Sequence, residues 1–191
     1  MRATSRGRSS PAEFVREELE TPRLRLRRWR AEDIQPLVRW HGDPALMRHM
    51  GRVATREQTE AVAERFLEHW TEHGFGWMTV WEKETETLVG RSGVAFHRLW
   101  PDDPEVGWLI DTPWQGRGYA TEAGAACVRH AFGELGLERV VSICTPENLA
   151  SRRVMEKLGF RVWRELDDPS LDLTLLLHVR ERNASREATG V

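Results

Sequence analysis

The sequence predicts a single α/β domain with a mixed sheet, and three observations support this fold class. The chain has 191 residues, a length typical of one domain. Apolar residues alternate with a period of two in several short runs and recur at helical spacing in others. These runs follow the order strand, two helices, three strands, helix, strand, helix and two strands, without an internal repeat.

The first part of the domain is expected to hold one strand and two helices. In "RLRLRRW", residues 23–29, leucines alternate with arginines, which predicts a half-buried strand. A short helix is expected over residues 36–41 and a longer one over residues 55–73. Thr55 begins a capping-box pattern at the start of the longer helix, and Gly74 is placed to end it.

Strand and helix patterns continue through the rest of the domain. Three strands are expected over residues 76–82, 88–97 and 104–110, followed by a helix ending near residue 135. A strand over 139–145, a helix over 148–159 and strands over 160–165 and 171–179 complete the pattern. We predict that residues 21–181 form the folded domain. Residues 1–20 and 182–191 are polar and aperiodic, and we expect both tails to be poorly ordered.

Composition excludes several classes of partner. The formal net charge is only −2, so no global field attracts nucleic acid or an anionic membrane. No apolar run approaches the ~20 residues of a membrane span, and no apolar segment follows the basic N-terminus as it does in a signal peptide. Cys127 and Cys144 form no CxxC pair, which suits a reducing compartment. We therefore expect a cytoplasmic protein.

The stretch "PWQGRGYATEAGAA", residues 113–126, places Gly116 and Gly118 just before an alanine-rich helix. A helix N-terminus carries unpaired N–H groups and partial positive charge, and glycines let the backbone approach an anion closely. The Walker pattern fails because no Gly-Lys-Ser/Thr follows, and the dinucleotide pattern fails because Thr121 stands where its third glycine belongs. From the loop alone, phosphate binding and tight helix packing are both open.

Two separate motifs resemble the GNAT acyltransferase superfamily. Residues 115–120 match Q/R-x-x-G-x-G/A, the acetyl-CoA pyrophosphate motif, and "NLASRRVMEKLGF", residues 148–160, resembles the second motif of the RimJ/RimL-like branch. "TPRLRLRRW" and "GYATEA" also look like that branch. The resemblance covers about residues 21 to 179. It implies an N-acetyltransferase fold whose mostly antiparallel sheet splays between its fourth and fifth strands and is flanked by about four helices.

The resemblance also implies where acetyl-CoA binds. Backbone N–H groups of the glycine loop would hold the pyrophosphate. The end of the preceding strand would pair with the pantetheine arm and direct an N–H at the thioester carbonyl, and the next helix would lie near the sulfur. No metal is expected. The cofactor-binding residues predicted in this way are Leu109, Ile110, Asp111, Gln115, Gly116, Arg117, Gly118, Tyr119, Ala120, Thr121, Asn148 and Ser151.

Amine acetylation requires a neutral amine, and Glu105 is the candidate base. An α-amino group has a pKa of about 7.7–8.0, whereas a lysine near 10.4 costs about 3 kcal/mol more to deprotonate. Glu105 lies ten residues before Gln115, a spacing at which some GNAT branches carry a glutamate base. Period-two alternation places it on the same strand face as Leu109, unless a bulge intervenes. The alternative is an exposed carboxylate in an acidic segment.

Ser151 is the candidate for protonating the departing sulfur. Many GNAT members place a tyrosine acid where this chain has Met155, and Tyr119, the only tyrosine, lies inside the glycine loop. Ser151 would therefore act directly or through water, or the thiolate would leave unprotonated. Asn148 is expected to cap its helix whatever else it contacts.

Aromatic residues near the predicted acetyl site suggest an acceptor-binding wall. Trp100, Trp108 and Trp114 bracket this site and would present an apolar or cation-binding surface to an amine. The acidic residues of "LWPDDPE" would add negative charge, or form a solvated loop. His97 ends a strand and is placed either to face the acceptor or to lie on the surface.

Two further patterns are weighed against simpler explanations. His69 and His73 have i, i+4 spacing, but no third metal ligand accompanies them, so a solvated helix face is expected instead. The run "LDLTLLLHV" would be able to pair across a homodimer if it forms an exposed final strand.

Three functional hypotheses follow. The first is an acetyl-CoA-dependent N-acetyltransferase acting on a primary amine, with a protein or peptide N-terminus favoured and aminoglycosides, polyamines or amino-acid-like acceptors open. The second is an acyl-CoA-binding module with weak turnover, which the replacement of the tyrosine by Met155 supports. The third, a nucleic-acid-associated protein, ranks last because the arginines are interleaved with acids.

Overall fold

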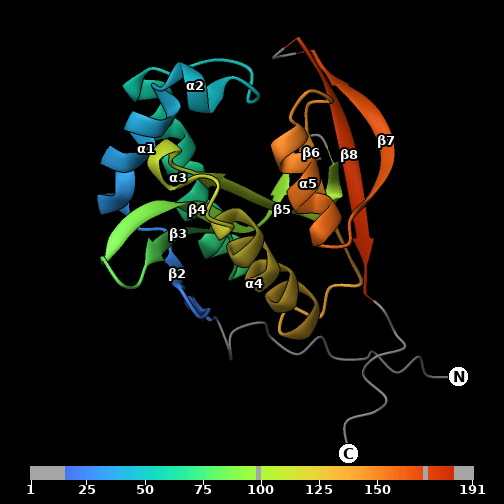
Figure 1. Ribbon diagram of the computed structural model, residues 1–191, viewed down its shortest axis with the longest axis horizontal. Coiled ribbons are helices and arrows are strands. Elements are labelled where there is room, and N and C mark those ends of the chain that lie inside the picture. Colours follow the sequence, from blue (N-terminus) through green and yellow to red (C-terminus); the bar gives the residue numbers. More distant parts are fainter. Residues whose placement is uncertain (1–15, 98–99, 170–171, 183–191) are drawn as a thin grey trace, which may run out of the picture.

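The computed structural model describes residues 16–97, 100–169 and 172–182, and within these ranges it confirms the α/β class (Figure 1). The strands are β1 (Glu18–Glu20), β2 (Leu24–Arg28), β3 (Trp77–Glu82), β4 (Thr87–His97), β5 (Trp100–Ile110), β6 (Arg139–Cys144), β7 (Arg161–Asp168) and β8 (Leu173–Glu181). The helices are α1 (Ile34–His41), α2 (Pro44–Met47), α3 (Arg56–His73), α4 (Tyr119–Gly133) and α5 (Leu149–Lys157), with short 3-10 turns η1 (Ala31–Asp33) and η2 (Thr112–Trp114).

The strands of the described chain form one eight-stranded mixed sheet with the order β1-β2-β3-β4-β5-β6-β8-β7. Only β5 and β6 run parallel; every other neighbouring pair is antiparallel. A parallel pair needs a long crossover connection, and α4 supplies it. Figure 1 shows α4 crossing in front of the sheet between its β2–β4 part and its β6–β8 part.

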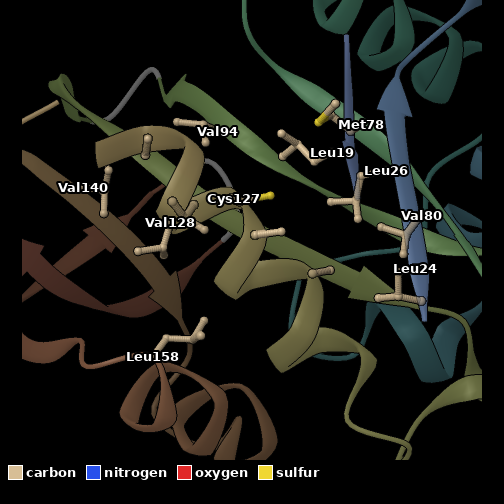
Figure 2. Packing of buried hydrophobic residues seen from close by; sticks show 14 of the residues in the cluster. Leu19, Leu24, Leu26, Met78, Val80, Val94, Cys127, Val128, Val140 and Leu158 are labelled. Atoms are coloured by element: carbon tan, nitrogen blue, oxygen red, sulfur yellow. The ribbon is translucent and has the colours of Figure 1, made fainter. Parts of the chain in front are cut away.

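Helices cover both faces of the sheet, so two main cores form. The larger core lies between the sheet and α4 and α5; Figure 2 shows Cys127 and Val128 of α4 there, close to Val94 and Val140 of the sheet. The second core lies between the sheet and the α1 and α3 helices. It contains Trp29, Leu37, Trp40, Ala63, Phe66 and Leu109.

The signals that begin and end α3 act as the sequence predicts. The Thr55 hydroxyl accepts a hydrogen bond from the Gln58 N–H, and the Gln58 side chain accepts one from the Thr55 N–H. Gly74 follows the helix with φ of +74°, the left-handed conformation that glycine adopts without strain.

None of the helices in the described ranges has the length and apolar character that a membrane span requires.

The structure corrects three expectations about the strands. Strand β1 lies inside the expected N-terminal tail, because it pairs along β2 and buries Leu19; residues 1–15 and 183–191 of the tails lie outside the described residues. Strand β5 begins at Trp100 rather than at residue 104, since Trp100 pairs with His97 of β4. Asp103 is also held by Arg139 through two hydrogen bonds of 2.8 and 2.9 Å. Strand β8 has neighbours on both sides, so it is not an edge that would pair across a dimer.

Candidate active site

A gap opens in the sheet between β5 and β6. Among the described residues, these two parallel strands share one registered pair, Glu105 with Val141. Beyond this pair β5 continues to Ile110 and β6 to Cys144, yet neither strand pairs with the other there. The sheet therefore splays at the place the family resemblance implies, although the two strands are the fifth and sixth because β1 precedes them.

The backbone of β5 presents donors to this gap. Asp111 N–H donates to the carbonyl of Val89, at 2.8 Å, so the polar groups of Asp111 and Leu109 face β4. By the same alternation, the N–H groups of Trp108 and Ile110 face β6 and the gap. Of the segment expected to offer an N–H to the thioester, Ile110 is thus oriented to do so, whereas Leu109 and Asp111 are turned toward β4.

Gln115 and Asp111 brace the turn that leads from β5 into the glycine loop. Gln115 Nε2 donates to the Ile110 carbonyl at 2.9 Å. Asp111 accepts from Thr112 N–H at 2.9 Å and from the Arg39 guanidinium at 2.6 Å. Burial alone would raise the pKa of Asp111, but these hydrogen bonds and the charge of Arg39 outweigh it and lower the pKa. Both side chains are therefore engaged in shaping the turn.

The glycine loop leaves an uncapped helix N-terminus. Gly116 and Gly118 have φ of +76° and +82°, and Gly118 is the N-cap of α4 without any side-chain hydrogen bond to the helix. A Cβ added at Gly116 would meet nothing within 4 Å, so space is open beside the backbone. Exposed N–H groups, partial positive charge and open space fit a pyrophosphate group. Residues 116–118 are exposed, Ala120 and Thr121 are half-buried, and Tyr119 is buried.

Asn148 and Ser151 lie in the first turn of α5, next after β6. Asn148 Oδ1 accepts the Ser151 N–H at 3.1 Å, which confirms Asn148 as the N-cap. Ser151 is half-buried. Met155, one turn further along, is fully buried in the core beneath α4 and α5. At the position of the usual tyrosine acid, this chain thus has a packing residue.

Glu105 is buried on the sheet face that α1 and α3 cover. The register from Gly90 to Ala95 is regular, and the bulge falls after Ala95, so the alternation from Glu105 to Leu109 holds. A Cβ on Gly107 would lie 2.6 Å from the Trp77 ring and 3.0 Å from Glu105 Oε1, which places both groups over that glycine. Burial raises the pKa of Glu105 to about 7, even though the charge of Arg91 lowers it. The exposed-carboxylate alternative is therefore wrong.

Arg91 is a site residue that sequence reasoning missed. It lies on β4, is buried, and stacks on the Trp77 ring with the guanidinium carbon 4.5 Å from the centroid. Its Nε has no hydrogen-bond partner in the described structure. Burial lowers its pKa to about 10, although the charge of Glu105 raises it. An arginine in the middle of the apolar run "LVGRSGVAF" was the signal in the sequence.

Two histidines lie on the side of the sheet that α1 and α3 cover. His41 of α1 is buried, and burial, followed by the charge of Arg91, lowers its pKa to about 4, so it is neutral at physiological pH. His49, between α2 and α3, lies 3.2 Å from the Thr145 hydroxyl through Nδ1. This contact joins the α1–α3 side to the end of β6. Nothing in the local sequence distinguishes either residue from an ordinary surface histidine.

The predicted tryptophan wall does not lie on one surface. Trp108 packs on the opposite face of β5 from Glu105, since a Cβ on Gly124 of α4 would lie 3.2 Å from its ring. Trp100 is buried with Val141 and two residues of β8, and His97 stacks on it with ring centroids 3.9 Å apart. Trp114 lies over the glycine loop, where the Arg117 guanidinium contacts its ring at 4.6 Å. The structure therefore brings His97 and Trp100 together and places Trp108 and Trp114 elsewhere.

His69 has a structural role rather than a solvated one. Its Nδ1 bonds the Phe75 carbonyl at 2.7 Å, and its Nε2 accepts the Phe96 N–H at 2.9 Å. His73 packs beside it with ring centroids 4.4 Å apart. The expectation of a solvated face is wrong for His69, because its ring lies between α3 and the end of β4 and bonds to the backbone on both sides. Within the described ranges, no group of three potential ligand side chains is placed to hold a metal ion.

The fold and the site together define the class of acyl-CoA-dependent acyltransferases: a mixed sheet splayed between two parallel strands, with a bare helix N-terminus at the gap. The sequence profile of the acetyltransferase (GNAT) domain matches residues 23–161, and the chain belongs to the GNAT acetyltransferase family. It is thus an N-acyltransferase enzyme by family membership.

Individual relatives agree with this assignment. The uncharacterized N-acetyltransferase YnaD of Bacillus subtilis (strain 168) is 29% identical, over 75% of this chain and 82% of YnaD. The crystal structure of an acetyltransferase from Agrobacterium tumefaciens str. C58 aligns with a TM-score of 0.78 and 28% identity, covering 92% of this chain and 100% of that one. RimL, a ribosomal L7/L12 alpha-N-protein acetyltransferase in complex with coenzyme A, shares the fold at a TM-score of 0.72 and 16% identity, over 86% of this chain and 98% of RimL.

Proposed function

We propose that this protein is a cytoplasmic, acetyl-CoA-dependent N-acetyltransferase of the RimJ/RimL-like branch, acting on the α-amino group of a protein or peptide. One observation carries the proposal. Strand β5 connects an uncapped, glycine-lined helix N-terminus at one end of the gap to a buried carboxylate, Glu105, at the other. Both features lie along one strand, which supports a site that combines binding with proton transfer.

Acetyl-CoA would supply an activated acyl group to this site. The N–H groups of residues 116–121 would hold its pyrophosphate, and those of Trp108 and Ile110 would bind along its pantetheine arm. An N–H directed at an acyl oxygen stabilises the negative charge that develops there during amine attack, a contribution worth about 2.7–4 kcal/mol in well-studied enzymes. Asn148 and Ser151 would lie by the sulfur, with Ser151 as the proposed proton donor.

Glu105 accepts the proton that the attacking amine must lose. Its pKa of about 7 lies near physiological pH, where a general base is most effective, and within about one unit of the pKa of an α-amino group. A lysine side chain, near 10.4, is about three units away. This difference supports an N-terminal amine as the acceptor over a lysine or a polyamine.

The binding half of this proposal is tested by isothermal titration calorimetry with acetyl-CoA. Gly116→Leu would fill the open space beside the loop, and we expect it to weaken or abolish micromolar binding. Gly136→Leu is the matched control, because Gly136 also has a positive φ, +65°, and nothing within 4 Å, but lies beyond the other end of α4. Absence of binding to the wild type, or equal loss in both variants, would contradict the proposed site.

The acceptor half is tested by coenzyme A release with three amines: a peptide with a free N-terminus, the same peptide N-terminally blocked but containing lysine, and a polyamine. We expect turnover with the first peptide only. Faster turnover of the polyamine would instead support a small-molecule acceptor. Binding of acetyl-CoA without turnover of any amine would favour the acyl-CoA-binding module, a function that the buried Met155 supports.

A further inference from the structure

Two segments that are far apart in the sequence meet beside the glycine loop. Thr21 and Arg23 precede β2, and Glu122 lies in the first turn of α4. The Thr21 hydroxyl and the Arg23 N–H both donate to Glu122 Oε1, at 2.7 and 2.9 Å. These contacts join the "TPR" of the first strand motif to the "TEA" that follows the glycine loop.

The Arg23 guanidinium continues from Glu122 to the loop itself. Its Nε donates to Glu122 Oε2 at 2.7 Å, and its Nη2 lies 2.6 Å from the same oxygen. Its Nη1 donates to the backbone carbonyl of Arg117 at 3.0 Å, and its central carbon lies 4.7 Å from the Tyr119 ring centroid. All three guanidinium nitrogens therefore have protein partners.

Glu122 is well suited to hold Arg23. Burial alone would raise the pKa of Glu122, but the hydrogen bonds from Thr21 and Arg23, with the charge of Arg23, outweigh it and lower the pKa. The carboxylate therefore stays ionised at physiological pH, and it fixes the side chain of Arg23 at a defined place.

The contact with Arg117 determines which way one peptide group faces. In a planar trans peptide, the carbonyl of Arg117 and the N–H of Gly118 point in opposite directions. Because Arg23 binds this carbonyl, the Gly118 N–H is turned to the other side. Gly118, at φ of +82°, has the conformational freedom that would otherwise let this peptide rotate. Rotation would turn a carbonyl oxygen toward the space where an anion is held.

We propose that Arg23, fixed by Glu122, is a positioning residue that orients the Arg117–Gly118 peptide for binding the pyrophosphate of coenzyme A. The inference rests on the proposed function. It assigns Arg23 the orientation of this peptide rather than the binding of a phosphate, because Nε, Nη1 and Nη2 are each directed at Glu122 or at the Arg117 carbonyl.

The test is calorimetric titration of coenzyme A and of 3′-dephospho-coenzyme A into the wild type and variants. We expect Arg23→Met to weaken both ligands by about tenfold, the effect of losing one charge-assisted hydrogen bond. Arg23→Lys should weaken them similarly, since an ammonium group lacks the planar fork that bridges Glu122 and Arg117. Arg25→Met is the matched control: Arg25 pairs with the exposed Glu86, so this substitution should leave both affinities unchanged.

Each alternative predicts a different pattern. A loss confined to coenzyme A would mean that Arg23 contacts the 3′-phosphate, and full rescue by lysine would mean that only its charge matters; either result overturns the proposal. Unchanged affinity in the Arg23 variants also overturns it. Thermal melting checks that the variants fold. If Arg23→Met is unstable, Glu122→Gln replaces it in the test; this substitution weakens the contact that holds Arg23, so it is expected to raise both dissociation constants. Failure of the wild type to bind either ligand would instead reject the proposed function.

Discussion

The two ends of the gap between β5 and β6 use charge in opposite ways. At the glycine loop, the groups proposed to bind belong to exposed backbone, and the nearby charges, on Arg23 and Arg117, lie at the surface. On the face toward α1 and α3, the charged groups are side chains with little exposure: 8% for Glu105, 6% for Arg91 and 5% for His41. Partial charges in water suit reversible binding of an anion, whereas buried side chains have displaced pKa values, as proton transfer requires.

The two ends also differ in how the chain builds them. The loop is one continuous segment from Gln115 to Thr121, shaped by two glycines. The buried face is assembled laterally from Trp77, Gly93 and Gly107 on three strands. Gly107 leaves room for the tryptophan ring beside Glu105, and Gly93 leaves room for the backbone of residues 76 and 77. If this division is correct, substitutions at one end should alter binding, and those at the other should alter turnover.

The largest effect is expected for Glu105→Gln. Removing the base should lower kcat/KM by about 10²–10⁴-fold, while the acetyl-CoA dissociation constant stays within about twofold. Coenzyme A release and calorimetry measure the two quantities. Asp103→Asn is the control, since it weakens the bidentate contact with Arg139 two residues earlier on the same strand and should affect melting more than turnover. Equal loss of turnover in both variants would point to a structural effect.

The next effect concerns the pH dependence of kcat/KM, which should follow the ionisation of Glu105. Glu105 must be ionised to accept a proton, and its pKa is about 7. With kcat/KM referred to the concentration of neutral amine, we expect it to fall as the pH drops below 7 and to be about tenfold under its plateau at pH 6. Arg91→Met removes the positive charge that favours the carboxylate, so the acidic limb should move to higher pH. Arg91→Lys should stay nearer the wild type. An unmoved limb in Arg91→Met would exclude coupling between the two groups.

A smaller effect is expected at the first turn of α5. Asn148→Ala removes the helix cap and should cost about 1 kcal/mol of unfolding free energy, measured by denaturant titration. Asn148→Asp keeps a capping oxygen and should restore most of this stability. If Asn148→Asp nevertheless binds acetyl-CoA as weakly as Asn148→Ala, the amide contacts the cofactor; if binding recovers with stability, Asn148 acts only as a cap.

The smallest effect concerns the thiols. Burial raises the pKa of Cys127 and of Cys144 to about 11, so at pH 8 only about 0.1% of each is thiolate. We expect native protein to react negligibly with a disulfide reagent over the time of an activity assay, and both thiols to react in denaturant. Rapid labelling of the native protein would show that α4 or the end of β6 opens readily.

The glycine turn before α4 could be predicted because its residues are contiguous, and a tight turn before a helix depends on local backbone chemistry; its binding of the cofactor stays a prediction. The family resemblance proposed Glu105, whose burial follows only from the packing of α1 and α3 over β5. Arg91 was visible as a charge within an apolar strand. Its neighbours Trp77 and Glu105, however, come from β3 and β5, and the order of residues along the chain does not specify these contacts. The tryptophan wall failed because proximity in sequence does not place side chains on the same strand face.

What the sequence by itself determined is most of the elements, apart from β1 and α2, together with their caps and the glycine turn, since these depend on residues within one or two turns of each other. Only the tertiary structure decided that Arg23 and Glu122, 99 positions apart, meet at this turn, and that Glu105 is dry enough to titrate near neutrality. The physical reason is that burial and long-range hydrogen bonding depend on how strands pair and helices pack, and the local pattern of a single sequence leaves both unspecified.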